Sequence, residues 1–212
     1  FFSFLHADAQ PDFGKSYINV SKPAGGTVDA GDILEIRASF VVRSLIYDSC
    51  AFFDTIPAGT SYIAGTLRVL TNEGKIYKQF SDARFTAPTT PNDEGWITVV
   101  SPSVTALRIN MGYLQTDIPA TVYRRGRIRN GAGHKPTFGG STIQVASYRV
   151  QVTAATGTFI NMGFGTMTYK LSTSLAAPVT FRFPSRVVAL YQNIGFCTNA
   201  TGVNALGAEF NG

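Results

Sequence analysis

The sequence predicts an all-β protein in which antiparallel strands form a sandwich of two sheets. Of its 212 residues, 44% are hydrophobic and only 15% are charged, and 21 are glycine. Short runs rich in β-branched and aromatic residues alternate with turn signals made of Gly, Pro, Asn and Asp. No long segment shows the 3.6-residue periodicity of an amphipathic helix. Together these observations favour strands over helices throughout.

The clearest element is the strand predicted over Ile33–Val42, which is rich in β-branched residues and partly alternates between polar and apolar side chains. Gly31-Asp32 supplies the turn before it, because Gly accepts positive φ and Asp can bond its own backbone. Pro57 and Gly59 end a later strand and redirect the chain.

The remaining strands are predicted from the same signals, and Asn72-Glu-Gly74 predicts a hairpin turn between two of them. In chain order, the other predicted strands are Ser16–Ser21, Asp48–Asp54, Thr60–Thr71, Lys75–Phe80, Trp96–Val100, Ala106–Met111, Thr121–Ile128, Thr142–Thr153, Thr158–Lys170 and Val179–Tyr191.

The chain is predicted to contain one large domain with an addition at each end. The sandwich is assigned to residues 11–175, and residues 176–212 to C-terminal strands and a linker toward a following region. Residues 1–10 resemble the end of a secretory signal, with the small-x-small pattern Ala7-Asp-Ala9. If Phe1–Ala9 is retained, it needs an apolar place, either its own core or a neighbour's groove as a donated strand. No window approaches the roughly 18–20 apolar residues of a membrane span.

The net charge of +5 comes largely from a basic run, Arg124, Arg125, Arg127 and Arg129. Such a run can form a patch for anionic glycans or nucleic acid. The alternative, which we favour, is a loop whose arginines pair with carboxylates elsewhere, so no nucleic-acid partner is predicted. No periodic aromatic interleaving accompanies the run.

Cys50 and Cys197 are the only cysteines. In an oxidising compartment they could form a disulfide that closes a very long loop. Two buried free thiols are the open alternative. No Cys/His spacing predicts a metal site, and no cofactor motif is present.

Several motifs occur in a recurring order: Tyr17-Ile-Asn-Val-Ser-Lys22, Gly31-Asp32, Ile36–Val42, Asp54-Thr-Ile-Pro-Ala-Gly59 and Gly157-Thr-Phe-Ile-Asn161. On these motifs, residues 14–175 resemble the DUF11 domain, a module repeated in large bacterial and archaeal surface proteins. The resemblance implies an immunoglobulin-like sandwich, with hairpins and loops inserted between Asn72 and Gly140. It implies no catalysis.

The segment Val188–Gly207 looks like parts of large secreted proteins of the Bacteroidetes, which are typically exported by the type IX system. This likeness implies a location outside the cell or on its surface. The implied partners are other subunits, later domains of the same chain, or cell-surface glycans.

Some surface modules of the immunoglobulin-like kind lock themselves with a Lys–Asn isopeptide bond, and the resemblance suggests candidates for one. Lys22, Asp54 and Asn161 occur in the required order of amine, proton-shuttling acid and carboxamide. Lys15 and Glu35 are alternatives to Lys22 and Asp54. Burial would favour the neutral amine and the protonated acid that the reaction needs. The alternative is ordinary polar residues at strand ends.

Short glycosylation patterns also occur, although such patterns often arise by chance. Asn19 and Asn199 head N-glycosylation sequons, while Ser49 and Thr55 follow aspartate as in Bacteroidetes O-glycosylation.

The sequence predicts no enzyme. The two histidines, His6 and His134, lie in the signal-like segment and in a Gly-rich loop, and no Gly-x-Ser-x-Gly elbow occurs. We therefore expect a non-catalytic extracellular structural or adhesive module of a large surface protein or fibre. The alternatives are a filament subunit assembled by N-terminal strand donation, and a carbohydrate- or matrix-binding module.

Overall fold

A computed structural model describes residues 11–43, 45–71, 77–79, 95–100, 103–111, 126–129, 142–163, 165–185 and 187–190. Within these ranges every regular element is a β-strand, and every strand pairing is antiparallel. The predicted all-β antiparallel sandwich is therefore confirmed. No helix in the described part of the chain has the length and apolar character to cross a membrane.

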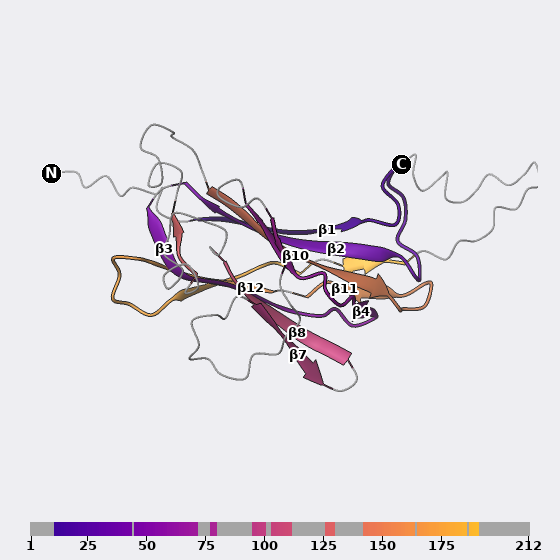
Figure 1. Cartoon of the computed structure of the whole chain (residues 1–212). Helices are drawn as coiled ribbons and strands as arrows, with labels where there is room; N and C mark the ends of the chain where they lie inside the picture. Colours follow the sequence, from indigo (N-terminus) through magenta and orange to yellow (C-terminus); the bar gives the residue numbers. More distant parts are fainter. Residues whose placement is uncertain are drawn as a thin grey trace, which may run out of the picture.

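The first sheet contains the longest strand pairing, between β2 and β10, and Figure 1 shows β1, β2 and β10 side by side. Its strand order is β1 (Asp12–Asn19), β2 (Ile33–Val42), β10 (Thr142–Val152), β5 (Arg68–Thr71) and β6 (Tyr77–Gln79), and β4 (Thr60–Tyr62) also pairs with β10.

The second sheet packs against the first, and its hairpin of β7 and β8 extends away from the body of the molecule in Figure 1. Its order is β13 (Val179–Arg182), β12 (Thr166–Leu171), β3 (Ile46–Thr55), β8 (Ser103–Asn110) and β7 (Gly95–Val100), and β9 (Ile128–Arg129) also pairs with β3. A two-stranded sheet of β11 (Phe159–Asn161) and β14 (Val187–Ala189) completes the fold.

Alternating side chains of both sheets build one core between them, as the two-residue period of a strand requires. On β2, alternate residues from Leu34 to Val42 are fully buried. The second sheet adds Phe52 and Met167, and Phe183 lies beyond β13. Val188 and Leu190 belong to the same core, so residues beyond 175 contribute to it.

A β-bulge in β3 decides which of its side chains face the core. The pairing with β12 shifts register between Thr168 and Lys170, and Ser49 takes a positive φ of 57°. The extra residue in β3 reverses the alternation of inward and outward side chains on either side of the bulge. As a result Tyr47 lies in the core together with Cys50 and Phe52, although its spacing from them is odd.

Three predicted strands are wrong in extent, because each is divided in two. Thr60–Thr71 is divided into β4 and β5 around Gly65, which has a φ of 73°. Thr158–Lys170 is divided into β11 and β12, with Gly163 and Gly165 at positive φ between them. Val179–Tyr191 is divided into β13 and β14, with Pro184 between them.

The hairpin predicted around Asn72–Gly74 is confirmed by the pairing of β5 with β6. Its turn residues lie outside the described ranges, as do Phe1–Ala9 and the predicted strand Thr121–Ile128 up to residue 125.

Candidate functional site between the two sheets

Lys15 and Asp54 form an ion pair inside the sandwich. Lys15 faces inward from β1 in the first sheet, and Asp54 faces inward near the end of β3 in the second. The Lys15 Nζ lies 2.7 Å from Oδ2 and 2.9 Å from Oδ1 of Asp54, and their side chains are 6% and 0% exposed. A pair of this kind links the two sheets directly.

The Asp54 carboxylate is fully occupied by donors. The Tyr148 hydroxyl, from β10, donates to Oδ2 at 2.8 Å, and the backbone N–H of Thr55 donates to Oδ1 at 3.0 Å. The Lys15 ammonium also donates to the carbonyl oxygen of Met162 at 3.0 Å. Buried polar groups with all partners satisfied rigidify a core and specify its arrangement.

Burial dominates the electrostatics of this cluster. Loss of water raises the pKa of Asp54 above its usual value of 3.8, although the Lys15 ammonium opposes the shift. Burial, followed by the neighbouring Asp54 charge, also raises the pKa of Tyr148 well above 10.0. The phenol therefore stays protonated and donates its hydrogen bond over the whole neutral range.

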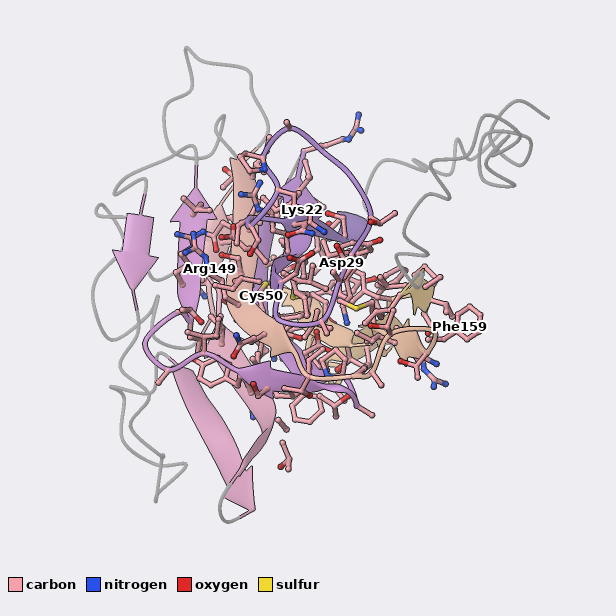
Figure 2. All side chains as sticks on the ribbon, turned by 90° about the vertical axis from the view of Figure 1, so that its right-hand side faces the viewer. Lys22, Asp29, Cys50, Arg149 and Phe159 are labelled. Carbon is pink, nitrogen blue, oxygen red and sulfur yellow. The ribbon has the colours of Figure 1, made fainter. Side chains whose placement is uncertain are left out.

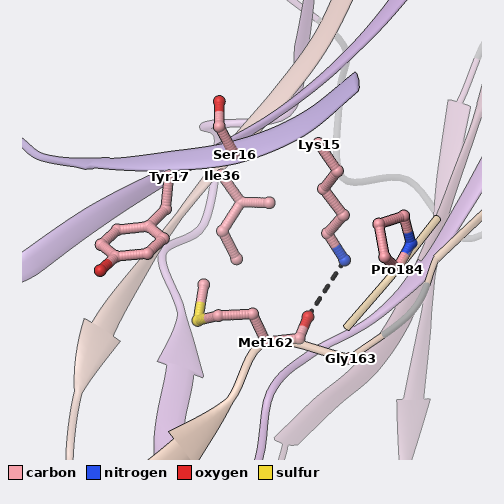
Figure 3. A pocket seen from close by; sticks show the side chains of 7 residues that line it. All are labelled: Lys15, Ser16, Tyr17, Ile36, Met162, Gly163 and Pro184. Atoms are coloured by element: carbon pink, nitrogen blue, oxygen red, sulfur yellow. Dashed lines mark hydrogen bonds between the residues drawn. The ribbon is translucent and has the colours of Figure 1, made fainter. Parts of the chain in front are cut away.

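The space beside Lys15 is very small. A cavity of about 10 Å³ is lined by Lys15, Tyr17, Ile36 and Met162, with Ser16, Gly163 and Pro184 at its margin (Figure 3). Such a volume holds one water molecule at most, whereas ligand pockets usually measure roughly 300–1,000 Å³. Among the described residues, the space beside the lysine amine is therefore too small for a substrate.

Gly165 completes the surroundings of the pair. Its φ is 59°, and a Cβ placed there would lie 3.1 Å from Asp54 Oδ1 and 3.3 Å from Lys15 Nζ. Only glycine combines this backbone conformation with such a close approach. Gly165 and Tyr148 were both missed by the sequence reasoning. The inward alternation of Tyr148 with Ala146 and Val150 was the signal that could have revealed it.

The residues proposed for an isopeptide bond lie in three separate places. Lys22 is bound by Asp29 and by Asp32, the latter at 3.0 Å, and Figure 2 shows Lys22 beside Asp29. Hydrogen bonds to these two carboxylates raise the pKa of Lys22. Glu35 faces outward from β2, on the opposite side of the first sheet from Asp54.

Asn161 is exposed on β11, where its side-chain oxygen accepts bonds from the Ser185 hydroxyl and from the backbone N–H of Gly163. Of the predicted residues, the structure therefore brings together Lys15 and Asp54. A covalent bond among them stays a prediction.

Cys50 is buried in β3 and forms no disulfide with any described residue, and burial raises its pKa well above 9.0. Cys197 lies outside the described residues, so the predicted disulfide remains a prediction. Gly126 packs on Cys50 so closely that an added Cβ would lie 2.5 Å from the Cys50 carbonyl oxygen.

The glycosylation candidates differ in their surroundings. The Asn19 side-chain nitrogen donates to Asp32 at 2.7 Å, and Ser49 occupies the bulge of β3. Thr55 is exposed at the end of β3. Asn199 lies outside the described residues.

Of the four arginines in the predicted basic patch, the structure describes the side chain of Arg127 alone. Its guanidinium binds Asp48 through Nε at 2.5 Å and Nη2 at 2.8 Å. This is the pairing with a distant carboxylate that the sequence offered as an alternative to ligand binding. Arg124 and Arg125 lie outside the described residues, and Arg129 is described only as part of β9.

In the described part of the chain, no group of three or more His, Cys, Asp or Glu side chains is arranged to hold a metal ion. The buried cluster of Lys15, Asp54 and Tyr148 is held by charge pairing and hydrogen bonding.

Comparison with protein-family models and with curated proteins finds no match. Among solved structures, the pilus backbone RrgB of Streptococcus pneumoniae is similar with a TM-score of 0.41 and 13% identity, over 76% of this chain and 31% of that one. The collagen-binding domain of a Staphylococcus aureus adhesin gives a TM-score of 0.42 and 14% identity, over 84% and 96% of the two chains.

The collagen-binding subdomain of the Enterococcus faecalis surface protein ACE gives a TM-score of 0.44 and 14% identity, over 85% and 97%. The collagen-binding structure of the Erysipelothrix rhusiopathiae protein RspB is matched over only 46% of its length. The chain thus spans less than half of the RrgB and RspB structures. At these identities the likeness concerns the fold alone.

Proposed function

We propose that this chain is a non-catalytic structural or adhesive module of a larger surface protein located outside the cell. The observation that carries the proposal is the buried Lys15–Asp54 pair with Tyr148. Its polar atoms are enclosed and satisfied within the protein, so the cluster joins the two sheets and presents no group to a substrate. Such a connection between the sheets suits a module that bears load between other domains.

The proposal is tested by pulling the chain between two marker domains in a single-molecule force experiment. We expect Lys15→Met to lower the unfolding force, because it leaves Asp54 buried without its cation, a loss of about 3–5 kcal/mol for a buried pair. Lys170→Met is the control, since Lys170 forms no ion pair among the described residues and is partly exposed. Equal unfolding forces for the two variants would contradict a mechanical role for the pair.

A covalent bond is also part of this proposal, but between Lys15 and Asp54 in place of the Lys–Asn bond that the sequence predicted, in which Asp54 was the proton-shuttling acid. If Lys15 Nζ attacks the Asp54 carboxyl carbon, a C–N bond forms, the C–O bond breaks and one water leaves. The step needs a neutral amine and a protonated acid, and the burial that raises the pKa of Asp54 favours that acid. Intact mass under denaturing conditions then shows the loss of one water, whereas a Lys22–Asn161 bond shows the loss of one ammonia. An unchanged mass means that Lys15 and Asp54 form an ion pair only.

The family and the lineage also belong to the proposal. The motifs from Tyr17 to Asn161 support a DUF11-like domain, and the segment after Val188 supports a secreted protein of the Bacteroidetes exported by the type IX system. Identifying the coding sequence that flanks this chain in its genome tests both. A type IX sorting domain downstream would support them, and its absence from the complete gene would remove the export assignment.

Assembly into a filament is the second candidate, and one edge strand of each sheet favours it. Among the described residues, β1 pairs with β2 alone and β13 with β12 alone. Both edges lie on the same side of the sandwich, since Phe13 stacks on Phe181 with ring centroids 4.2 Å apart. A donated strand could complete either edge. Light scattering on the mature chain should show oligomers that disappear when Phe1–Ala9 is deleted, and a monomer in both cases would reject assembly through this segment.

A further inference from the structure

The outward face of the first sheet carries three arginines around one carboxylate. Glu35 and Arg37 share this face of β2, and Arg149 lies directly opposite Glu35 on β10. Arg68, on β5, and Arg37 both lie opposite Ser147 of β10. We refer to Arg37, Arg68 and Arg149 together with Glu35 as the arginine cluster.

Glu35 organises the cluster from beneath. Its Oε1 accepts from Nε of Arg37 at 2.8 Å, and Nη2 of Arg37 lies 2.8 Å from the same oxygen in an ion pair. Its Oε2 accepts from Nε of Arg149 at 3.0 Å and from Nη2 of Arg68. Arg68 also donates through Nε to the Ser147 hydroxyl at 2.9 Å. The Glu35 side chain is only 1% exposed despite its outward position, because the arginines cover it.

The two exposed arginines of the cluster share a single carboxylate. Arg37 and Arg149 both bond to Glu35, so the positive charge of this pair exceeds the negative charge that it contacts. Arg37 and Arg149 are 41% and 39% exposed. In the described structure, Arg149 bonds to Glu35 only through Nε, so both of its Nη groups are available to an acceptor from solution. Nitrogen atoms gather beside Arg149 in Figure 2.

The outward positions of β2 and β10 that flank the cluster carry no further carboxylate. These residues are Ile33, Ser39, Val41, Ile143, Val145 and Gln151. On these two strands, the outward face is therefore polar and apolar, with Glu35, Arg37 and Arg149 as its charged residues.

We propose that the arginine cluster binds a sulfate group of a sulfated polysaccharide. A sulfate ester has three terminal oxygens, which can accept from Arg37 and Arg149 at the same time in the forked geometry that guanidinium offers. Glu35 already holds these side chains in place, so little ordering is required on binding.

The sheet face favours a polysaccharide over a peptide. Peptides usually add to a sheet edge or place a helix in an apolar groove. The arginine cluster lies on neither kind of surface, since Glu35 and Arg149 belong to the paired strands β2 and β10. This inference is independent of the structural role proposed above, because a chain that does not bind sulfate could still bear load.

The test is the fluorescence anisotropy of a labelled heparin hexasaccharide titrated with the full chain at low salt. We expect saturable binding that weakens as salt is added. Arg149→Gln should weaken binding about tenfold to a hundredfold, as the loss of charge-assisted hydrogen bonds does. The matched control is Arg182→Gln, which removes the same charge from an exposed position of β13 in the other sheet.

A second variant, Arg149→Lys, keeps the charge next to Glu35 and removes the planar fork. It should weaken binding several-fold while circular dichroism shows the same fold, which separates recognition from misfolding. Desulfated heparin should fail to compete with the labelled probe.

Three results would overturn the proposal. The first is an absence of binding at low salt. The second is an equal loss for Arg149→Gln and Arg182→Gln, which would indicate non-specific attraction. The third is equally effective competition by poly-glutamate or by single-stranded DNA, which would show that the cluster does not select a sulfated polysaccharide.

Discussion

Substitution of Gly165 tests how closely the core packs around the Lys15–Asp54 pair. Gly165→Ala should lower the free energy of unfolding in two ways. Positive φ disfavours alanine by about 1–2 kcal/mol, and crowding against the Asp54 carboxylate adds about 1–3 kcal/mol. Gly157 is the matched control, because its φ is 83° and a Cβ there meets no atom within 4 Å. Urea unfolding that shows equal losses for Gly157→Ala and Gly165→Ala would contradict the crowding.

Tyr148 provides a second prediction at the scale of the residue. Tyr148→Phe removes one donor from the buried Asp54 carboxylate, and we expect a loss of about 1–3 kcal/mol in the free energy of unfolding. Tyr17→Phe is the control, because Tyr17 also faces inward from a strand but its hydroxyl makes no hydrogen bond within the described structure. Its effect should stay within about 0.5 kcal/mol. If the two losses measured by thermal unfolding are similar, the Tyr148 hydroxyl contributes nothing specific.

At the scale of the element, strands should differ in their protection from hydrogen exchange. β10 pairs with β2, β4 and β5, whereas β13 pairs with β12 alone among the described strands. Local opening needs less free energy where fewer neighbours must separate. Mass spectrometry should therefore find peptides from Thr142–Val152 protected much longer than peptides from Val179–Arg182. Equal protection of the two would mean that another chain covers the β13 edge.

At the scale of the whole molecule, Glu35 should make the free energy of unfolding depend on pH in the acidic range. Burial acts to raise its pKa, but hydrogen bonds from the three arginines outweigh burial and hold the pKa below 4.5. A lowered pKa contributes stability above the unfolded value, and that contribution is lost as the pH falls through the folded value. Wild type should therefore lose stability as the pH decreases below 4.5.

Glu35→Gln removes this contribution, so the difference in stability between wild type and variant should narrow on acidification. The raised pKa of Asp54 changes stability with pH in the direction opposite to that of Glu35. Because Asp54 is present in both proteins, its contribution cancels when the two are compared. Urea unfolding at a series of pH values measures the difference. Parallel stability curves would show that the arginines do not stabilise the Glu35 carboxylate.

Local patterns in the sequence were enough to predict most of the strands. The bounds of Ile33–Val42 agree with β2 because turn residues precede it and its apolar side chains alternate. The strands predicted over Thr60–Thr71 and Thr158–Lys170 were too long. Each contains glycines, and a glycine within a strand-like sequence does not reveal whether the backbone turns there. The bulge at Ser49 was equally invisible, since a serine carries no local signal for positive φ.

The candidate site was predictable only in part. Asp54 and Lys15 were singled out by type and order, but Lys22 was preferred and Tyr148 was missed. A two-residue period tells which face of a strand a side chain occupies. It does not tell which residue of a distant strand lies opposite, since that depends on register and on bulges.

The sequence by itself determined an all-β chain with alternating faces and glycine-rich turns, because those properties follow from each residue and its near neighbours. Tertiary structure alone decided that Lys15 meets Asp54 inside the sandwich, while Lys22 binds Asp29 and Asp32 and Glu35 gathers three arginines outside. The physical reason is that a charged side chain forms its ion pair with the group that the packing of distant strands places within bonding distance. Lys15 and Asp54 are 39 positions apart in the chain, and Glu35 and Arg149 are 114 apart.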